Sequence, residues 1–160
     1  MGGRVNASRL GLAAAVTFNT AMNAYHRYTE SRANELIGEL KAADLVVGYN
    51  VLEFDYQVLR GYTIEHLADL PTLDMLEQLS RRLGFRPSLE SVVTATLRSA
   101  KSADGLQAVR WYRQGQMDKV LEYCQKDVEL TKRLYEYGKQ FKLVYYWDKA
   151  FQRQVVGVNW

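Results

Sequence analysis

Hydrophobic and polar positions follow two different periods along the chain, and their order predicts an α/β fold. Segments 9–19 and 24–28 are rich in β-forming residues and predict an antiparallel hairpin. Ser31 is then the predicted N-cap of a helix that continues at helical spacing to Ala43. The apolar run 45–50 is too short for a helix, so it predicts a buried strand after that helix, as in a β-α-β unit.

The second half of the chain is predicted to be mainly helical. Apolar residues at helical spacing predict helices over about 54–61, 73–83, 88–97 and 105–113. A longer helix is predicted over 117–137, with its buried stripe at Met117, Val120, Cys124, Thr131, Leu134 and Gly138. Segments 143–147 and 154–158 have strand composition and predict a C-terminal β-hairpin. The chain contains no repeat, low-complexity segment or linker, so residues 1–160 are predicted to form a single α/β domain.

Composition excludes several classes of protein. Apolar residues make up 48% of the chain and charged residues 24%, which is typical of globular proteins and unlike a disordered chain. No window reaches the roughly 20 apolar residues of a membrane-spanning helix, and no signal peptide is recognisable. Cys124 is the only cysteine, so no internal disulfide can form and a cytoplasmic location is expected. With only two histidines besides, a zinc site of the usual ligand types is excluded, and any metal would take oxygen ligands.

The net charge of +3 is unevenly distributed along the chain. Segment 81–113 contains seven basic residues against Glu90 and Asp104, a local charge of +5. Such a stretch can follow a phosphate backbone. A solvated helical surface is the alternative, and charge alone favours that alternative.

Asp127 is the most informative single position. Counted from Val120, it falls at i+7 on the stripe of the long helix that is expected to face the core. A buried carboxylate without a partner costs several kcal/mol, so a cation, an arginine or backbone donors should lie beside it. Tyr123 lies one turn earlier on the same face. The alternative is a structural aspartate that accepts hydrogen bonds from a loop backbone.

A second candidate site follows the buried strand at 45–50. The strand ends at Asn50, and Asp55 follows five residues later at the start of a predicted helix. In open α/β sheets, ligands bind outside the carboxyl ends of the strands, where both residues would lie. The alternative for Asp55 is an ordinary acid at a helix N-terminus, where it favours the helix dipole.

The two candidate sites form a spaced pair of motifs. Asn50-x-x-x-Phe54-Asp55 is followed, about 70 residues later, by Tyr123-x-x-x-Asp127 within a predicted helix. This pair resembles the second and third acidic motifs of the DEDDy 3′–5′ exonucleases. Segments 72–76 and 101–105 are also similar to a bacterial RNase H-like family of predicted exonucleases. The resemblance covers nearly the whole chain and implies an RNase H-like mixed sheet flanked by helices.

The resemblance implies a metal-dependent 3′–5′ exonuclease acting on the 3′ end of single-stranded DNA or RNA. In the family, two Mg²⁺ or Mn²⁺ ions lie about 3.5–4 Å apart and hold the scissile phosphate. By this resemblance, Asp127 would bind the first metal, Asp55 would support the second, and Tyr123 would orient the attacking water. Asn50 and Phe54 would line the pocket of the 3′-terminal nucleotide.

Nucleic-acid binding is expected to be electrostatic and to use the basic segment 81–113. Within it, Arg98 and Lys101 are the candidate phosphate contacts. The aromatic run 145–147 could stack on bases, although packing of the hairpin against the long helix is the favoured interpretation of that run.

The chain departs from the family in one important respect. The first family motif, Asp-x-Glu on a central strand, supplies two of the four acids, and no such motif precedes Glu30 here. We therefore expect the sequence to start just downstream of that strand, as it would if a start codon were placed late. Two sheet edges would then be exposed, and they would close on each other or be covered by a second copy or a partner chain. Metal binding is expected to be weak and nuclease activity very low.

Two other interpretations remain open. The chain could be a catalytically silent RNase H-like module that binds nucleic acid or a protein. It could also be a cytosolic α/β protein without a nucleic-acid role. If the protein does not retain single-stranded DNA or RNA at low salt, this last interpretation is favoured.

Overall fold

The N-terminal part of the structure is a β-hairpin followed by a helix. The computed structural model describes residues 12–99 and 105–160. Strands β1 (Ala14–Asn19) and β2 (Ala24–Thr29) pair antiparallel, as predicted, and residues 9–11 of the predicted strand lie outside the described residues. A 3-10 turn (Glu30–Arg32) leads into α1 (Ala33–Ala42). The predicted N-cap at Ser31 is wrong, because Ser31 lies inside this turn, whose backbone already bonds the Ala33 N–H to the Glu30 carbonyl.

The middle of the chain contains a short parallel pair of strands. Strand β3 (Val46–Gly48) pairs with β4 (Thr72–Asp74). Between them lie a π-helical turn η3 (Val51–Asp55), helix α2 (Tyr56–Leu59) and a 3-10 turn (Leu67–Asp69). The sequence prediction missed β4, because a helix was predicted from residue 73. A strand of three residues is too short to show a period of its own, and its partner is distant in the sequence.

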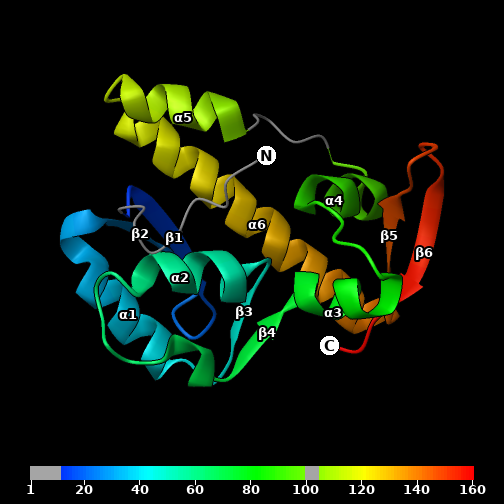
Figure 1. Cartoon of the computed structure of the whole chain (residues 1–160), viewed down its shortest axis with the longest axis horizontal. Helices are drawn as coiled ribbons and strands as arrows, with labels where there is room; N and C mark the ends of the chain where they lie inside the picture. The colour runs from blue at the N-terminus through cyan, green and yellow to red at the C-terminus, as the bar shows by residue number, and fades with distance from the viewer. Residues whose placement is uncertain (1–11, 100–104) are drawn as a thin grey trace.

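The second half of the chain is helical up to a C-terminal hairpin, as predicted. It contains α3 (Met75–Leu83), α4 (Leu89–Leu97), α5 (Gly105–Arg113), α6 (Met117–Phe141), and the antiparallel strands β5 (Leu143–Trp147) and β6 (Arg153–Gly157). Helix α6 runs four residues beyond the predicted end at residue 137 and stops where Lys142 takes a left-handed conformation with φ 57°. Figure 1 shows α6 crossing the whole molecule.

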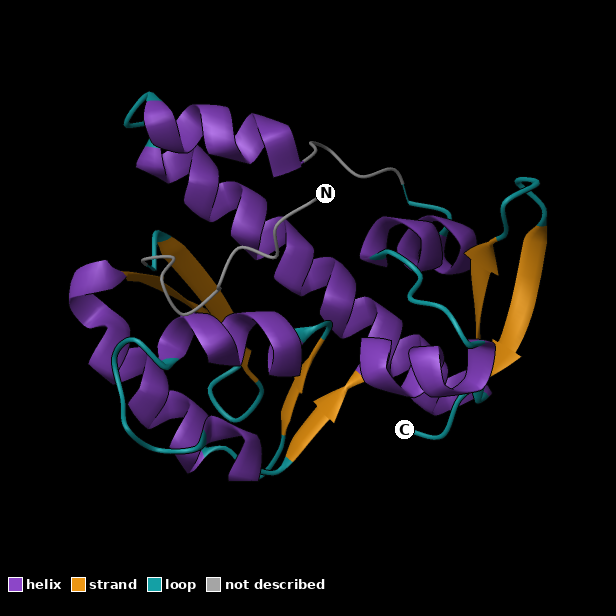
Figure 2. Cartoon of the chain, in the orientation of Figure 1, coloured by secondary structure: helices purple, strands orange, loops and turns teal. Residues whose placement is uncertain are grey.

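The side chains that exclude water form two separate cores. The first core joins the N-terminal hairpin to α1, α2 and β3, and its buried residues are Leu12, Tyr28, Ala33, Leu36, Ile37, Val46, Tyr56, Val58, Leu59 and Leu67. The second core joins α3, α4, the C-terminal half of α6 and the last strands, with Met75, Leu79, Val92, Val93, Leu130, Leu134, Val144, Val156, Val158 and Trp160. Figure 2 shows the two groups of elements on either side of the β3–β4 pair.

The strands of the described residues form three two-stranded sheets rather than one mixed sheet. Within residues 12–99 and 105–160, β1 pairs only with β2, and β3 pairs only with β4. One backbone edge of β1 and one of β3 therefore have no strand partner in this part of the chain. The expectation that a further strand belongs between them stays a prediction.

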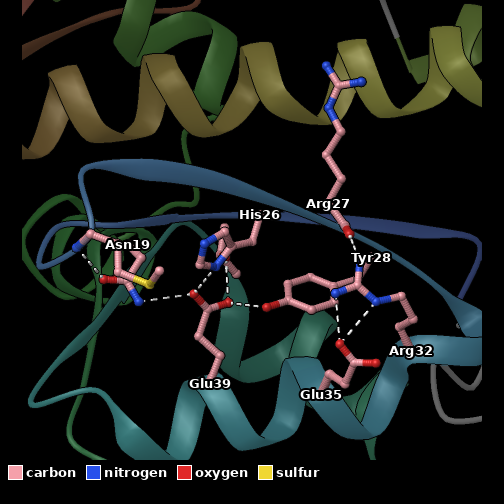
Figure 3. A network of polar contacts seen from close by, with 9 residues as sticks. Asn19, His26, Arg27, Tyr28, Arg32, Glu35 and Glu39 are labelled. Atoms are coloured by element: carbon pink, nitrogen blue, oxygen red, sulfur yellow. Dashed lines mark hydrogen bonds and ion pairs between the residues drawn. The ribbon is translucent and has the colours of Figure 1, made fainter.

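The Glu39 carboxylate on α1 connects this helix to the N-terminal hairpin through hydrogen bonds (Figure 3). Glu39 accepts hydrogen bonds from the Thr17 hydroxyl at 2.6 Å, the Tyr28 hydroxyl at 2.7 Å and the Asn19 amide at 3.2 Å. The His26 Nδ1 lies 2.7 Å from the same carboxylate. Burial alone would raise the pKa of Glu39, but these hydrogen bonds outweigh it and hold the pKa below its usual range. Burial and the neighbouring Glu39 together raise the pKa of Tyr28 to about 12.

Replacing Glu39 by glutamine should destabilise the protein by about 2 kcal/mol at neutral pH, because the side chains that donate hydrogen bonds to Glu39 lose a charged acceptor. The pKa of Glu39 is lowered in the folded state. The contribution of its charge to stability is therefore complete above the unfolded pKa of about 4.3 and is lost as the pH falls below that value. Urea unfolding at pH 7 and in this acid range measures the difference. Glu35→Gln on the same helix is the control, because Glu35 forms only an exposed ion pair with Arg32. Equal effects of both substitutions would contradict the role given to Glu39.

The side chain of Trp160 packs against α6 at a position where the helix has a glycine. The Trp160 indole donates to the Tyr135 carbonyl at 3.1 Å, and its ring lies against Gly138. A side chain at position 138 would occupy the volume of the indole. The glycine on the predicted buried stripe is therefore explained by this close approach rather than by a turn.

Candidate functional site

The first candidate motif begins where β3 ends. A side chain at Gly48 would collide with that of Val51, so only glycine lets the chain turn this tightly. Asn50 takes the left-handed conformation with φ 66° and ψ 28°, which asparagine tolerates better than most residues. The Phe54 N–H donates to the Asn50 carbonyl at 3.1 Å, and η3 then continues into α2. The motif therefore lies at the carboxyl end of a strand, as predicted.

Asp74 holds this motif in place, and the sequence interpretation did not assign it a role. Its side chain is only 4% exposed and sits between two backbone segments. It accepts from the N–H groups of Asn50 at 2.8 Å and Leu52 at 3.1 Å. As the N-cap of α3, it also accepts from Leu76 at 3.1 Å and Glu77 at 3.4 Å. The signal that could have found it is an aspartate followed three residues later by a glutamate, a pattern typical of helix N-termini.

Arg86 is the second residue that the sequence interpretation did not single out. Its guanidinium donates to the Asn50 side-chain oxygen at 2.7 Å and lies 3.2 Å from the Glu53 carboxylate. The loop before α4 is thereby connected to the motif, and the Tyr49 hydroxyl adds a bond to the Pro87 carbonyl. Part of the basic segment 81–113 is thus compensated by an acid of the motif itself.

Asp55 and Phe54 are presented at the end of η3. The Phe54 ring is 48% exposed, which leaves it available to a ligand. The protein packed around the Asp55 carboxyl disfavours its charged form and raises its pKa to about 6, and the nearby Asp74 adds to the effect. The side chain nevertheless remains open to solvent, so a ligand can reach it.

The second candidate motif lies in the middle of α6. Tyr123, Cys124 and Asp127 are all half-buried, so the predicted stripe is correct in direction but is not closed from solvent here. Burial, and to a smaller extent the negative charges of Asp127 and Asp55, together raise the pKa of the Cys124 thiol to about 11. Both carboxylates therefore act on the same thiol. Asp55, from η3, and Asp127, from α6, are thus each close enough to Cys124 for their charge to affect the thiol.

The donor set of this region fits the implied metals only in part. Across the described ranges 12–99 and 105–160, no three His, Cys, Asp or Glu side chains are arranged so that they could hold a metal ion. Asp74 does not add a ligand, because its oxygens already accept four backbone N–H groups. Asp55 and Asp127 supply carboxylate oxygens, which Mg²⁺ and Mn²⁺ prefer, but two carboxylates do not complete a two-metal site.

The candidate phosphate contacts lie elsewhere. Arg98 ends α4 in a left-handed conformation with φ 54° and lines a surface cleft together with Trp147 and Arg153. Lys101 lies outside the described residues. The favoured interpretation of residues 145–147 is partly confirmed, because β5 contacts α6, but it packs more extensively on α4 and leaves Trp147 39% exposed.

Comparison with known proteins gives a family for the chain. No helix within the described residues is both long enough and apolar enough to cross a membrane. A family model described as the RNase H superfamily matches residues 10–138, which include both candidate motifs. Searches of curated proteins and of solved structures found no match. Since the matched segment covers well over half of the sequence, the chain belongs to the RNase H superfamily.

Proposed function

We propose that residues 1–160 form one nuclease-type domain that acts on phosphodiester bonds at the 3′ end of single-stranded nucleic acid. The observation that carries the proposal is the match of residues 10–138, which contain both motifs, to the RNase H superfamily. The charges of Asp55 and Asp127, about 70 residues apart, both affect the Cys124 thiol, which supports it. Their separation and surroundings resemble the DEDDy arrangement of acids, and membership of the RNase H superfamily supports nuclease-like chemistry.

Each residue of the two motifs has a role in this proposal. Asp55 and Asp127 supply oxygen ligands to Mg²⁺ or Mn²⁺, whose chemistry would be to activate water and polarise the phosphate. The Tyr123 hydroxyl, one turn from Asp127 on α6, orients a water molecule. The exposed Phe54 ring and the Asn50 side chain line the pocket of the terminal nucleotide, and Arg86 holds that amide in position.

The remaining acids must come from a strand other than those described. The edges of β1 and β3 that lack a strand partner in the described part of the chain can each add one by main-chain pairing. A segment beyond this sequence or a partner chain would supply it, because a second copy of this chain carries no strand with Asp-x-Glu among its described residues. With Asp55 and Asp127 alone, metal binding should be weak and hydrolysis slow.

The test compares this chain with a polypeptide that is extended before Met1 by a strand carrying Asp-x-Glu. Both are incubated with a single-stranded oligonucleotide labelled at its 5′ end, with Mg²⁺ or Mn²⁺, and the products are separated by length. We expect stepwise shortening from the 3′ end only with the added strand. A matched fusion with Asn-x-Gln is the control. Equal digestion by the chain alone and by both fusions would contradict the proposal.

A catalytically silent module that binds nucleic acid is the second candidate, and it is favoured because no three possible metal ligands of residues 12–99 and 105–160 are grouped together. If the Asp-x-Glu fusion is folded and binds single strands but does not shorten them, this second function replaces the first.

A further inference from the structure

A surface cleft lies between the C-terminal half of α4 and the β5–β6 hairpin. Its volume is about 380 Å³, and it is lined by Thr94, Ala95, Arg98, Ser99, Trp147 and Arg153. This volume is at the lower end of the roughly 300–1,000 Å³ that small-molecule sites occupy. Neither Asp55 nor Asp127 lines it, so the cleft is separate from the carboxylate region. Figure 1 shows α4 and the hairpin together, on the far side of the molecule from α2.

Two arginines give the cleft a positive charge. Arg98 and Arg153 are both exposed, and neither forms an ion pair with an acid of the described residues. The Arg153 Nε donates to the Ala95 carbonyl at 2.8 Å, and its guanidinium lies 3.6 Å above the centre of the Tyr145 ring. These contacts fix the guanidinium plane while the outer nitrogens face no acid in the described part of the chain. A fixed, planar guanidinium is suited to bidentate binding of a phosphate.

Trp147 supplies an aromatic surface that is held equally firmly. Its indole N–H donates to the Thr94 hydroxyl at 3.0 Å, and its backbone N–H donates to the Ser91 hydroxyl at 3.0 Å. The side chain is nevertheless 39% exposed. Since the ring is already oriented by α4, a ligand that stacks on it pays little side-chain entropy.

We propose that this cleft binds one nucleotide of a single-stranded nucleic acid, with its phosphate between Arg98 and Arg153 and its base against Trp147. An acidic peptide would satisfy the arginines but not the fixed indole, whereas a nucleotide uses both. The proposal rests on the proposed function for the nature of the strand, and it adds a second contact point away from the acids. The hairpin would thereby hold a strand whose end is at the carboxylate region.

The test measures binding without cleavage. Fluorescence anisotropy of a fluorescein-labelled oligothymidylate, about 12 nucleotides long, is recorded in EDTA over a range of salt concentrations. Arg98→Gln/Arg153→Gln should weaken binding at low salt about tenfold and reduce the slope of log K against log salt by about 0.7, as expected for one lost phosphate contact. Trp147→Leu should weaken binding to a similar extent and leave that slope unchanged, because stacking releases no counterions.

Matched controls separate the cleft from general charge. Arg32→Gln/Lys41→Gln removes the same charge from two exposed ion pairs outside both the cleft and segment 81–113, and it should change binding less than twofold. Because Arg153 also contacts Ala95, Arg98→Gln alone is the second variant, and its urea unfolding should match that of the wild-type protein.

The outcomes that overturn the proposal are specific. Unchanged binding of the cleft variants overturns it, and so does equal weakening by the control pair. Displacement of the oligonucleotide by polyglutamate at equal charge, with no effect of Trp147→Leu, indicates a general acidic ligand and also overturns it. Failure of the nuclease proposal is distinguishable, because a chain that never shortens a strand still shows the cleft-dependent anisotropy.

Discussion

Asp74→Asn should destabilise the protein by about 3 kcal/mol and loosen the candidate site at the same time. The substitution keeps the size of the side chain but replaces one acceptor oxygen with an amide that faces backbone N–H groups. Because Asn50 and Leu52 donate to different oxygens of Asp74, one of these two N–H groups then loses its acceptor inside a site that is only 4% exposed. Urea unfolding measures the loss of stability, and amide hydrogen exchange at these two residues measures the loosening.

Asp69→Asn is the matched control for this substitution. Asp69 is an exposed residue of the 3-10 turn just before β4, and surface changes of this kind stay within about 0.5 kcal/mol. If Asp74→Asn unfolds at the wild-type urea concentration with unchanged exchange at Asn50, the motif is held by other contacts.

Asp127→Asn should reduce nuclease activity to background in the polypeptide that carries the added Asp-x-Glu strand. The amide keeps the shape of the side chain on α6 but removes a carboxylate charge from the region shared with Asp55. Tyr123→Phe should instead slow the reaction by roughly 10²–10⁴-fold with little change in metal affinity, as expected for a group that positions a proton. Time courses of 3′ shortening at several Mg²⁺ concentrations separate the two effects.

Asp118→Asn is the control on the same helix. Asp118 is exposed in the first turn of α6 and should leave the rate unchanged. Full activity of Asp127→Asn would remove this residue from the site, and a Tyr123→Phe variant that needs much more Mg²⁺ would assign the phenol to metal binding instead.

Elements with a clear local pattern could be predicted from the sequence. The two hairpins, α4, α5 and the start of α6 occur where hydrophobic spacing and β-forming residues placed them. The predicted start of a helix at residue 88 is correct to within one residue, because Ser88 is the N-cap of α4 and its hydroxyl accepts from the Ser91 N–H at 3.1 Å, a contact within one turn. Such features depend on contacts between residues that are close in the sequence, so a local sequence pattern predicts them.

Features that depend on distant contacts were the ones missed. Strand β4 exists because Thr72–Asp74 pairs with β3. Besides capping α3, Asp74 holds the Asn50 loop, and it does so only because that loop reaches it across the pair. Nothing in the residues around Asp74 or Arg86 indicates these partners. In contrast, the pairing of Asp55 with Asp127 in one site follows from the family resemblance and not from spacing, since about 70 residues separate them, and it stays a prediction.

The division of the molecule into two cores also determines how it can open. Asp55 belongs to the elements of the first core, whereas α6 carries Asp127 and anchors its C-terminal half in the second. Sub-global unfolding of the first core alone would separate the two acids while the second core stays folded. Any ligand that bridges both acids binds only the closed form and must suppress this opening by mass action. Occupancy of the site is therefore coupled to the cooperativity of the whole fold.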